Sequence, residues 1–339
     1  MLRKTPVALA LVAAWGLCPG AASAQSANAP AAAASPATLP PITNTATRTD
    51  RRVDEVPATV TVVPATDIEA AGARDIKDLF RNQVDLTVRS ATGRFGLAGA
   101  STGRAGNEGI NIRGLEGNQV LMLVDGIRVP GSFSFGAVAT GRADYLALEA
   151  TQAAEVLRGP ASTSFGSDGL AGALSLRTLD PDDVLKAGQA AGGFVRLAGT
   201  QVDDSVVLTG AAALRQGHWQ ALLLLSQRQG RETRSQGTNE ALNSSRTAPN
   251  PMDYRQQVLL GKVFFSPVPA HRLGVTVEAM QRRTETDVYS GRALPPAPPA
   301  VLPATAVLDL DASDRVQRTR VSAEHRYDDL NGLWFQKAE

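Results

Sequence analysis

The residues of this sequence that could carry out chemistry are few and widely separated. It contains three histidines, His218, His271 and His325, and a single cysteine, Cys18. No nucleophile can be placed with a base and an orienting acid, and no cluster has the spacing of metal ligands. The glycine-rich segments also lack the spacing of a phosphate-binding loop. The sequence therefore predicts no enzyme, no metal site and no permanently bound cofactor.

Four charged residues stand out because they lie in or beside otherwise apolar strand-like segments. They are Arg113, Glu116, Glu155 and Arg158. A charge in such a segment needs an ionic partner once it is enclosed, because an unpaired buried charge is costly. An ordinary salt bridge inside one domain would satisfy these residues.

The N-terminus has the composition of an export signal. Two basic residues precede the apolar stretch Val7–Leu17, and Ala22-Ser23-Ala24 supplies the small residues that signal peptidase needs. The apolar stretch is about 11 residues long, which is too short for a membrane-spanning helix. Residues 1–24 are therefore predicted to be a signal peptide of Sec-type export, with a retained anchor as the alternative. Its removal would take away Cys18, so neither disulfides nor thiolate metal sites are expected.

Charge and hydropathy narrow the class of protein further. The formal net charge is +1 and becomes −1 without the two basic residues of the signal. A nearly neutral chain without a basic stripe is not expected to bind nucleic acid. After the signal there is no apolar run of about 18 residues, which argues against a helical membrane protein. Any membrane role would need a β-barrel, because only helices and closed barrels satisfy their backbone groups in lipid.

Residues 25–52 are predicted to form a disordered tether, because they begin as Ala, Ser, Pro and Asn without periodicity. Within the tether, residues 39–48 are β-prone and uncharged until their end. Such a segment suits pairing with the exposed sheet edge of another protein, and a plain linker is the alternative. Its uncharged residues are Leu39, Pro40, Pro41, Ile42, Thr43, Asn44, Thr45, Ala46 and Thr47.

Residues 53–182 mix strand-like segments with short amphipathic helices, which predicts one compact α/β domain. A glycine-rich stretch, residues 90–107, predicts a long loop of the kind that is usually functional or disordered. Strands are expected at 59–63, 86–88, 110–113, 120–124, 127–129, 153–157 and 174–178, and helices at 68–71 and 75–82.

Residues 193–339 alternate apolar and polar positions, and the helical pattern vanishes. About seven strands of roughly ten residues are expected, with short turns at one end and long polar loops at the other, as in outer-membrane barrels. A soluble β-sandwich is the alternative. A barrel that encloses a domain needs about 22 strands, so the chain is interpreted as a truncated form with an incomplete barrel. A complete smaller protein is the other possibility.

Three segments resemble the TonB-dependent outer-membrane receptors. They are residues 108–118, 120–128 and 155–174, whose order and spacing are similar to those of a plug domain. The resemblance extends over residues 39–339 and is weaker in the second half. It implies an α/β plug domain followed by an incomplete antiparallel transmembrane β-barrel. The expected location is the outer membrane of a Gram-negative bacterium, in contact with its lipid.

The same resemblance implies partners and residue roles. Residues 39–48 would be the TonB box, which pairs with TonB, so that TonB with ExbB and ExbD drives import. Arg113, Glu116, Glu155 and Arg158 would lock the plug to the barrel wall. Neither role is catalytic.

Residues 111–118 and 175–181 look like the haem and haemoglobin receptor branch, which implies haem, free or from a haemoprotein, as the transported ligand. Haem iron is usually held by histidine, or in some proteins by tyrosine. Residues 53–182 contain no histidine and only one tyrosine. A siderophore or cobalamin receptor and a non-transporting secreted β protein are the alternatives. The ligand-contact candidates are Phe95, Phe133, Phe135 and Tyr145; the phenylalanines could cover a porphyrin face or pack inside the barrel.

Overall fold

The computed structural model describes residues 42–43, 51–56, 58–73, 75–89, 109–131, 133–135, 138–140, 145–161, 168–293, 306–328 and 337–338. Residues 40–339 form one unit, and residues 1–39 lie outside the described residues. The predicted signal peptide, most of the tether and the loop 90–107 therefore also lie outside them. Within the described part, no helix is long and apolar enough to cross a membrane.

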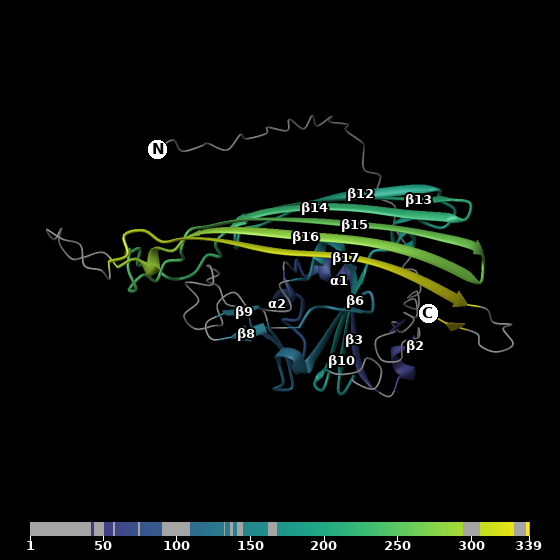
Figure 1. Cartoon of the computed structure of the whole chain (residues 1–339), viewed down its shortest axis with the longest axis horizontal. Helices are drawn as coiled ribbons and strands as arrows, with labels where there is room; N and C mark the ends of the chain where they lie inside the picture. Colours follow the sequence, from purple (N-terminus) through teal and green to yellow (C-terminus); the bar gives the residue numbers. More distant parts are fainter. Residues whose placement is uncertain are drawn as a thin grey trace, which may run out of the picture. The chain divides into compact units, whose positions relative to one another are not determined.

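The first half of the unit is an α/β domain built on a five-stranded mixed sheet (Figure 1). Its strand order is β3-β10-β11-β6-β7, with β11 and β6 parallel and the other neighbours antiparallel. β6 is buried at every position, as expected for a strand covered on both faces. The strands are β3 (Thr59–Pro64), β6 (Val120–Val124), β7 (Ile127–Arg128), β10 (Thr151–Arg158) and β11 (Gly172–Thr178).

Shorter elements complete this domain. Three two-stranded pairs form, β1 with β2, β4 with β5 and β8 with β9. Their bounds are β1 (Ile42–Thr43), β2 (Arg51–Arg52), β4 (Leu86–Arg89), β5 (Gly109–Ile112), β8 (Phe133–Phe135) and β9 (Val138–Thr140). The helices are α1 (Ala65–Ala70), α2 (Ile76–Leu79) and α4 (Pro181–Val184), and the 3₁₀ turns are η1 (Val53–Glu55), η3 (Gly117–Gln119) and η5 (Leu148–Ala150).

The two helices α1 and α2 contribute to the main core of the domain. Ile68 of α1 and Ile76 of α2 pack in one cluster with apolar residues of β6, β10 and β11. The helix predicted at 75–82 is confirmed at its start, where the Asp75 side chain accepts a hydrogen bond from the N–H of Asp78 at 2.8 Å, but it is shorter. The start predicted for α1 is wrong by three residues, because β3 runs directly into the helix through Pro64.

The second half of the unit is a long sheet of seven antiparallel strands in sequence order (Figure 1). The two end strands, β12 and β18, do not pair with each other, so the described strands form an open sheet. The loop at 232–251 lies at one end, together with residues 288–293, which contain η6 (Tyr289–Gly291), and residues 306–310. The tight turns at 217–218 and 269–270 lie at the other end. The strands are β12 (Ala191–Thr200), β13 (Ser205–Gln216), β14 (Trp219–Arg231), β15 (Met252–Val268), β16 (His271–Asp287), β17 (Asp311–Asp328) and β18 (Lys337–Ala338).

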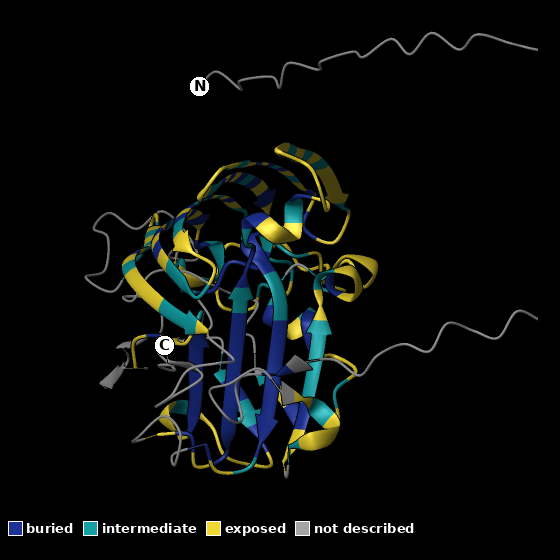
Figure 2. Ribbon diagram, turned by 90° about the vertical axis from the view of Figure 1, so that its right-hand side faces the viewer, coloured by how far each residue is buried: buried dark blue, intermediate teal, exposed yellow. Residues whose placement is uncertain are grey.

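Side chains alternate between two faces of the long sheet, and Figure 2 shows this as alternating colours along the strands. Leu222, Leu224 and Leu260 are buried on the face that contacts the α/β domain, which we call the inner face. Leu223 and Leu225 are exposed on the opposite, outer face. The predicted fold class, an α/β domain followed by antiparallel strands that do not close, is confirmed.

The predicted length of the strands is wrong for β15, β16 and β17, which have 17, 17 and 18 residues rather than roughly ten. The apolar pattern marked only the middle of each strand. Polar residues continue the same hydrogen-bonded ladder at the end with the long loops, because ladder pairing does not require apolar side chains.

Candidate functional site

A group of buried charges joins the turn after β6 to the inner face of the long sheet. Asp125 accepts a hydrogen bond from Nη2 of Arg320 on β17 at 2.6 Å. Its carboxylate also lies 3.7 Å from Nζ of Lys262 on β15. A second guanidinium nitrogen of Arg320, Nη1, donates to the carbonyl oxygen of Val124 at 2.9 Å. One turn of the α/β domain is thereby tied to two strands of the sheet.

The local fold explains why Asp125 reaches this position. β6 and β11 are parallel and in register, so Val124 lies beside Leu176 and the following turn lies beside Thr178. Asp125 and Gly126 both have positive φ, 47° and 75°, which aspartate tolerates better than most residues and glycine adopts freely. The N–H and the hydroxyl of Thr178 donate to the two Asp125 oxygens at 2.8 and 2.6 Å, which fixes the direction of the carboxylate.

The inner face supplies the balancing charges. Glu278 on β16 is paired in register with Arg320, whose Nε donates to it at 3.0 Å, and it also pairs with Arg318. Lys262 donates to Asp180 at 2.7 Å. Three carboxylates thus face three cations. We call this set the Asp125 network; it comprises Asp125, Asp180, Lys262, Glu278, Arg318 and Arg320.

The environment of Asp125 favours its ionised form. Burial alone would raise its pKa, but the neighbouring Lys262 and Arg320 and the hydrogen bonds from Arg320 and Thr178 outweigh burial. The pKa of the Asp125 carboxyl is therefore held below its ordinary value. Asp125 is consequently ionised at neutral pH.

A second contact between the domain and the sheet lies around η5. Glu149 accepts from Nε of Arg228 on β14 at 3.0 Å and from Gln256 on β15 at 3.3 Å. Beside it, Ala147 and Ala150 pack in one cluster with inner-face apolar residues of β13 to β16. The contact therefore combines one ion pair and a hydrogen bond with close packing of small side chains.

The structure places two of the four predicted locking residues on partners within the α/β domain. Nε of Arg113 lies 3.6 Å from Asp85. Arg158 donates to the Thr61 hydroxyl at 2.6 Å and to Gln83 and the Val84 carbonyl, both at 3.2 Å. Arg113 thus makes a salt bridge, and Arg158 makes hydrogen bonds, inside the α/β domain. This matches the alternative of an interaction within one domain that the sequence left open. A locking role for Arg113, Glu116, Glu155 and Arg158 stays a prediction.

Part of the segment 39–48 is described. β1, Ile42–Thr43, pairs antiparallel with β2, and Thr43 is fully buried. The Thr43 hydroxyl donates to Oε2 of Glu155, in the middle of β10, at 2.7 Å. The other residues of the segment lie outside the described part of the chain.

The ligand-contact candidates are only partly described. Phe95 lies outside the described residues, and for Phe133 and Phe135 the structure gives only the backbone of β8. Tyr145 is half-buried against the main core of the α/β domain. His271 and His325 contact each other at 2.9 Å at the tight-turn end of the long sheet, and His218 contacts the carbonyl of Ser266. Within the described ranges, no group of three or more acidic, histidine or cysteine side chains could hold a metal ion.

Sequence comparison identifies the α/β domain. Residues 52–173 match the family described as TonB-dependent Receptor Plug Domain. The α/β domain is thus a plug domain of the TonB-dependent receptor type. The resemblance inferred from the three sequence segments is confirmed.

The relatives of this chain are named for iron-bearing proteins, haem or vitamin B12. The "Hemoglobin and hemoglobin-haptoglobin-binding protein A" of Haemophilus influenzae is 26% identical over 73% of this chain and 23% of its own length. The "Hemin receptor" of Yersinia enterocolitica is 33% identical over 50% of this chain and 22% of its own length. Other relatives are named as transferrin-binding, lactoferrin-binding or vitamin B12 transport proteins. The chain thus spans just under a quarter of the length of the first and second of these relatives.

Solved structures agree on the fold. The ferripyoverdine receptor of the outer membrane of Pseudomonas aeruginosa superposes with a TM-score of 0.57 and 16% sequence identity, over 86% of this chain and 34% of its own. The relatives are receptors, binding proteins and transporters, so the prediction that the chain is not an enzyme is confirmed.

Proposed function

We propose that this receptor takes part in the uptake of haem, free or from a haemoprotein, across the outer membrane of a Gram-negative bacterium. The observation that carries the proposal is the pair of relatives named for haemoglobin and hemin. Haem is the transported cargo in this proposal and not a resident cofactor.

The Asp125 network supports a plug that can move. Buried ion pairs hold groups in register, yet their net contribution is small because both charges must leave water. The charges of Asp125, Lys262 and Arg320 can be rehydrated when a plug shifts, whereas a wholly apolar contact has no such compensation. Charged ties therefore suit a contact that must hold at rest and separate during transport.

The proposed energy source is TonB, working with ExbB and ExbD and recognising residues 39–48. The described part of this segment, Ile42–Thr43, is already extended and paired as a strand. Addition of an extended segment to a sheet edge is a common mode of peptide recognition. Export of the chain by its signal peptide to the outer membrane, where exposed apolar residues of the outer face meet lipid, belongs to the same proposal.

Growth tests separate the candidate ligands. Deleting the gene for this receptor is expected to abolish growth on haemin as the sole iron source, and a plasmid copy of the intact gene should restore it. Unchanged growth on haemin would reject haem as the ligand. Loss of growth on a ferric siderophore, or of vitamin B12 uptake, would instead favour a siderophore or cobalamin receptor. Recovery of the product in the water-soluble fraction would favour a secreted β protein.

The contact of Thr43 with Glu155 gives a test of how the TonB segment is held. Replacing Thr43 with valine keeps the shape but removes the hydrogen bond to a carboxylate, so the free energy of unfolding should fall by about 1–2 kcal/mol. Amide hydrogen exchange at residues 42–43 should accelerate. The matched control is Thr59→Val on β3, where the side chain is exposed and the change should be within about 0.5 kcal/mol. Equal exchange in the two variants would show that Thr43 does not hold the segment.

A further inference from the structure

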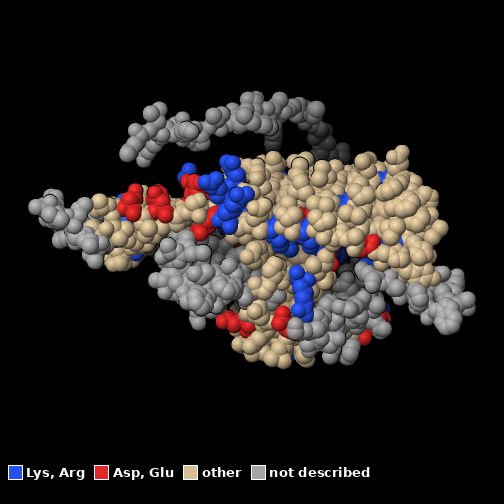
Figure 3. All heavy atoms as spheres, viewed as in Figure 1, with Lys and Arg blue, Asp and Glu red and all other residues tan. Residues whose placement is uncertain are grey.

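Three arginines lie side by side on the outer face of the long sheet. Arg255 on β15 is paired in register with Arg283 on β16, and Arg283 is paired with Arg315 on β17. All three side chains are exposed. We call them the arginine row. Figure 3 shows Lys and Arg side chains gathered on the long sheet toward the end that carries the long loops.

Protein carboxylates neutralise this row only in part. Arg283 pairs with Glu285 at 2.9 Å, and Arg315 donates to the side-chain oxygen of Gln281 at 2.9 Å. Among the described residues, Arg255 has no ion pair or hydrogen bond of its side chain. Like charges on neighbouring strands are destabilising, so three adjacent arginines favour an anionic partner from outside the chain.

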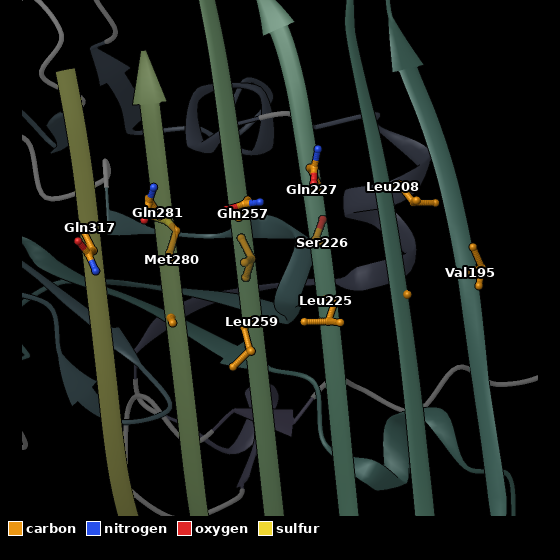
Figure 4. A pocket seen from close by; sticks show the side chains of 13 residues that line it. Val195, Leu208, Leu225, Ser226, Gln227, Gln257, Leu259, Met280, Gln281 and Gln317 are labelled. Carbon is orange, nitrogen blue, oxygen red and sulfur yellow. The ribbon is translucent and has the colours of Figure 1, made fainter. Parts of the chain in front are cut away.

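A row of four glutamines lies next to the arginine row on the same face. On each of β15, β16 and β17 the glutamine is two residues nearer the middle of the strand than the arginine. The in-register pairs run from Gln227 to Gln257, Gln281 and Gln317 across β14 to β17. Figure 4 shows these side chains as one line above Leu225 and Leu259. They border a hollow of about 660 Å³ on the outer face. Two small residues, Gly210 and Ala279, line the hollow. The space beside Gly210 is open, because a side chain added at this position would meet no other atom within 4 Å of its Cβ.

Beyond the hollow, the outer face is apolar as far as the tight turns, where aromatic side chains gather. Trp219 lies 4.6 Å from Phe265, and His271 lies 5.0 Å from Tyr327, between ring centroids. From His271 to Gln281 the strand rises about 33 Å at roughly 3.3 Å per residue. A tilt of about 40° reduces this to about 25 Å, the height of the apolar band of an outer-membrane barrel.

We propose that the arginine row, the glutamine row and the hollow form a binding site for an anionic lipid with a phosphorylated headgroup in the outer leaflet. The inference rests on the proposed outer-membrane function, since long loops mark the outer side of such proteins. The guanidinium groups match phosphate oxygens in charge and geometry. The glutamine amides can bond the linkages below the headgroup, and an acyl chain lies against Leu225 and Leu259 in the hollow.

Flotation of the full chain with liposomes tests this site. Neutral phosphatidylcholine liposomes are compared with the same liposomes containing diphosphoryl lipid A. The wild-type chain should bind the second kind more tightly, and the preference should weaken as salt rises. Each arginine near an anionic surface contributes roughly a fivefold preference, so R255Q/R283Q/R315Q should lose at least about tenfold.

Two variants make the test specific. R52Q/R81Q/R234Q removes the same charge from exposed positions outside the row and should keep the preference. R255K/R283K/R315K keeps the charge and should retain most of it. Equal binding of wild type to both liposomes, or an undiminished preference in R255Q/R283Q/R315Q, would overturn the lipid site and leave the receptor function standing. Failure to associate with either liposome would overturn the outer-membrane function itself, and the lipid site with it.

Discussion

Replacing Glu278 with glutamine is expected to lower the free energy of unfolding by about 3–5 kcal/mol, the usual cost of removing one member of a buried ion pair. Glu278 is only 1% exposed and is the partner of both Arg318 and Arg320. A neutral amide would leave Arg318 without its carboxylate partner and Arg320 with Asp125 alone. Urea unfolding in detergent, followed by tryptophan fluorescence, measures the loss.

The same strand provides the matched control. Glu285 on β16 makes a comparable ion pair with Arg283 at 2.9 Å, but both side chains are about 60% exposed. Exposed pairs contribute about 0–1 kcal/mol, so Glu285→Gln should change stability little. Equal losses in the two variants would show that burial of Glu278 does not set its contribution.

Replacing Asp125 with asparagine is expected to cost about 3 kcal/mol at neutral pH, because it leaves Lys262 and Arg320 facing an amide instead of a carboxylate. Asparagine tolerates the positive φ at this position, so the backbone turn should persist. The matched control is Asp85→Asn, which also has positive φ, 62°, but makes an exposed 3.6 Å pair with Arg113. That change should cost less than about 1 kcal/mol.

The effect of Asp125 should depend on pH in a defined direction. Its folded pKa is lower than the ordinary value of about 3.9, so its contribution to stability is complete above that value. The contribution is lost as the pH falls through the lowered folded pKa, where wild-type Asp125 also becomes neutral. The stability difference between wild type and Asp125→Asn should therefore shrink in acid. A constant difference from pH 7 to pH 2 would contradict the charge-based explanation.

Much of the fold could be predicted because local patterns determine it. The five apolar residues Val120–Val124 followed by Asp125-Gly126 specify a buried strand and a tight turn, and both are present. Trp219, Ala221, Leu223 and Leu225 stand at alternate positions, which predicts that they share one face of a strand, and they do so in β14. The helix α4 was missed although its signals were present. Pro181 starts it, and Asp183 accepts the N–H of Asp180 at 2.8 Å, a common helix-start pattern.

The Asp125 network could not be assembled from the sequence, because it joins residues up to 195 positions apart. Pairing at that distance depends on how the turn after β6 meets the sheet, which no local pattern encodes. A partial signal did exist. Lys262 lies two residues from the buried Leu260, and Glu278 lies two residues from the buried Met280. Residues two apart in a strand share a face, so both charges lie on the covered face of the sheet. Charges at covered positions need partners, although the sequence does not say which.

The position of β3 at the end of the plug sheet has a mechanical consequence. β3 is bonded to β10 alone, while β10 is bonded on both sides and carries Glu155, the residue that holds Thr43. Traction applied to the N-terminal segment would first break the pairing of β1 with β2 and the hydrogen bond from Thr43, and would then load β3 from its Thr59 end. An edge strand can detach by losing one ladder, whereas removal of β10 requires two. The load would therefore be released stepwise at the margin of the plug, and β10, β11 and β6 would keep their mutual register.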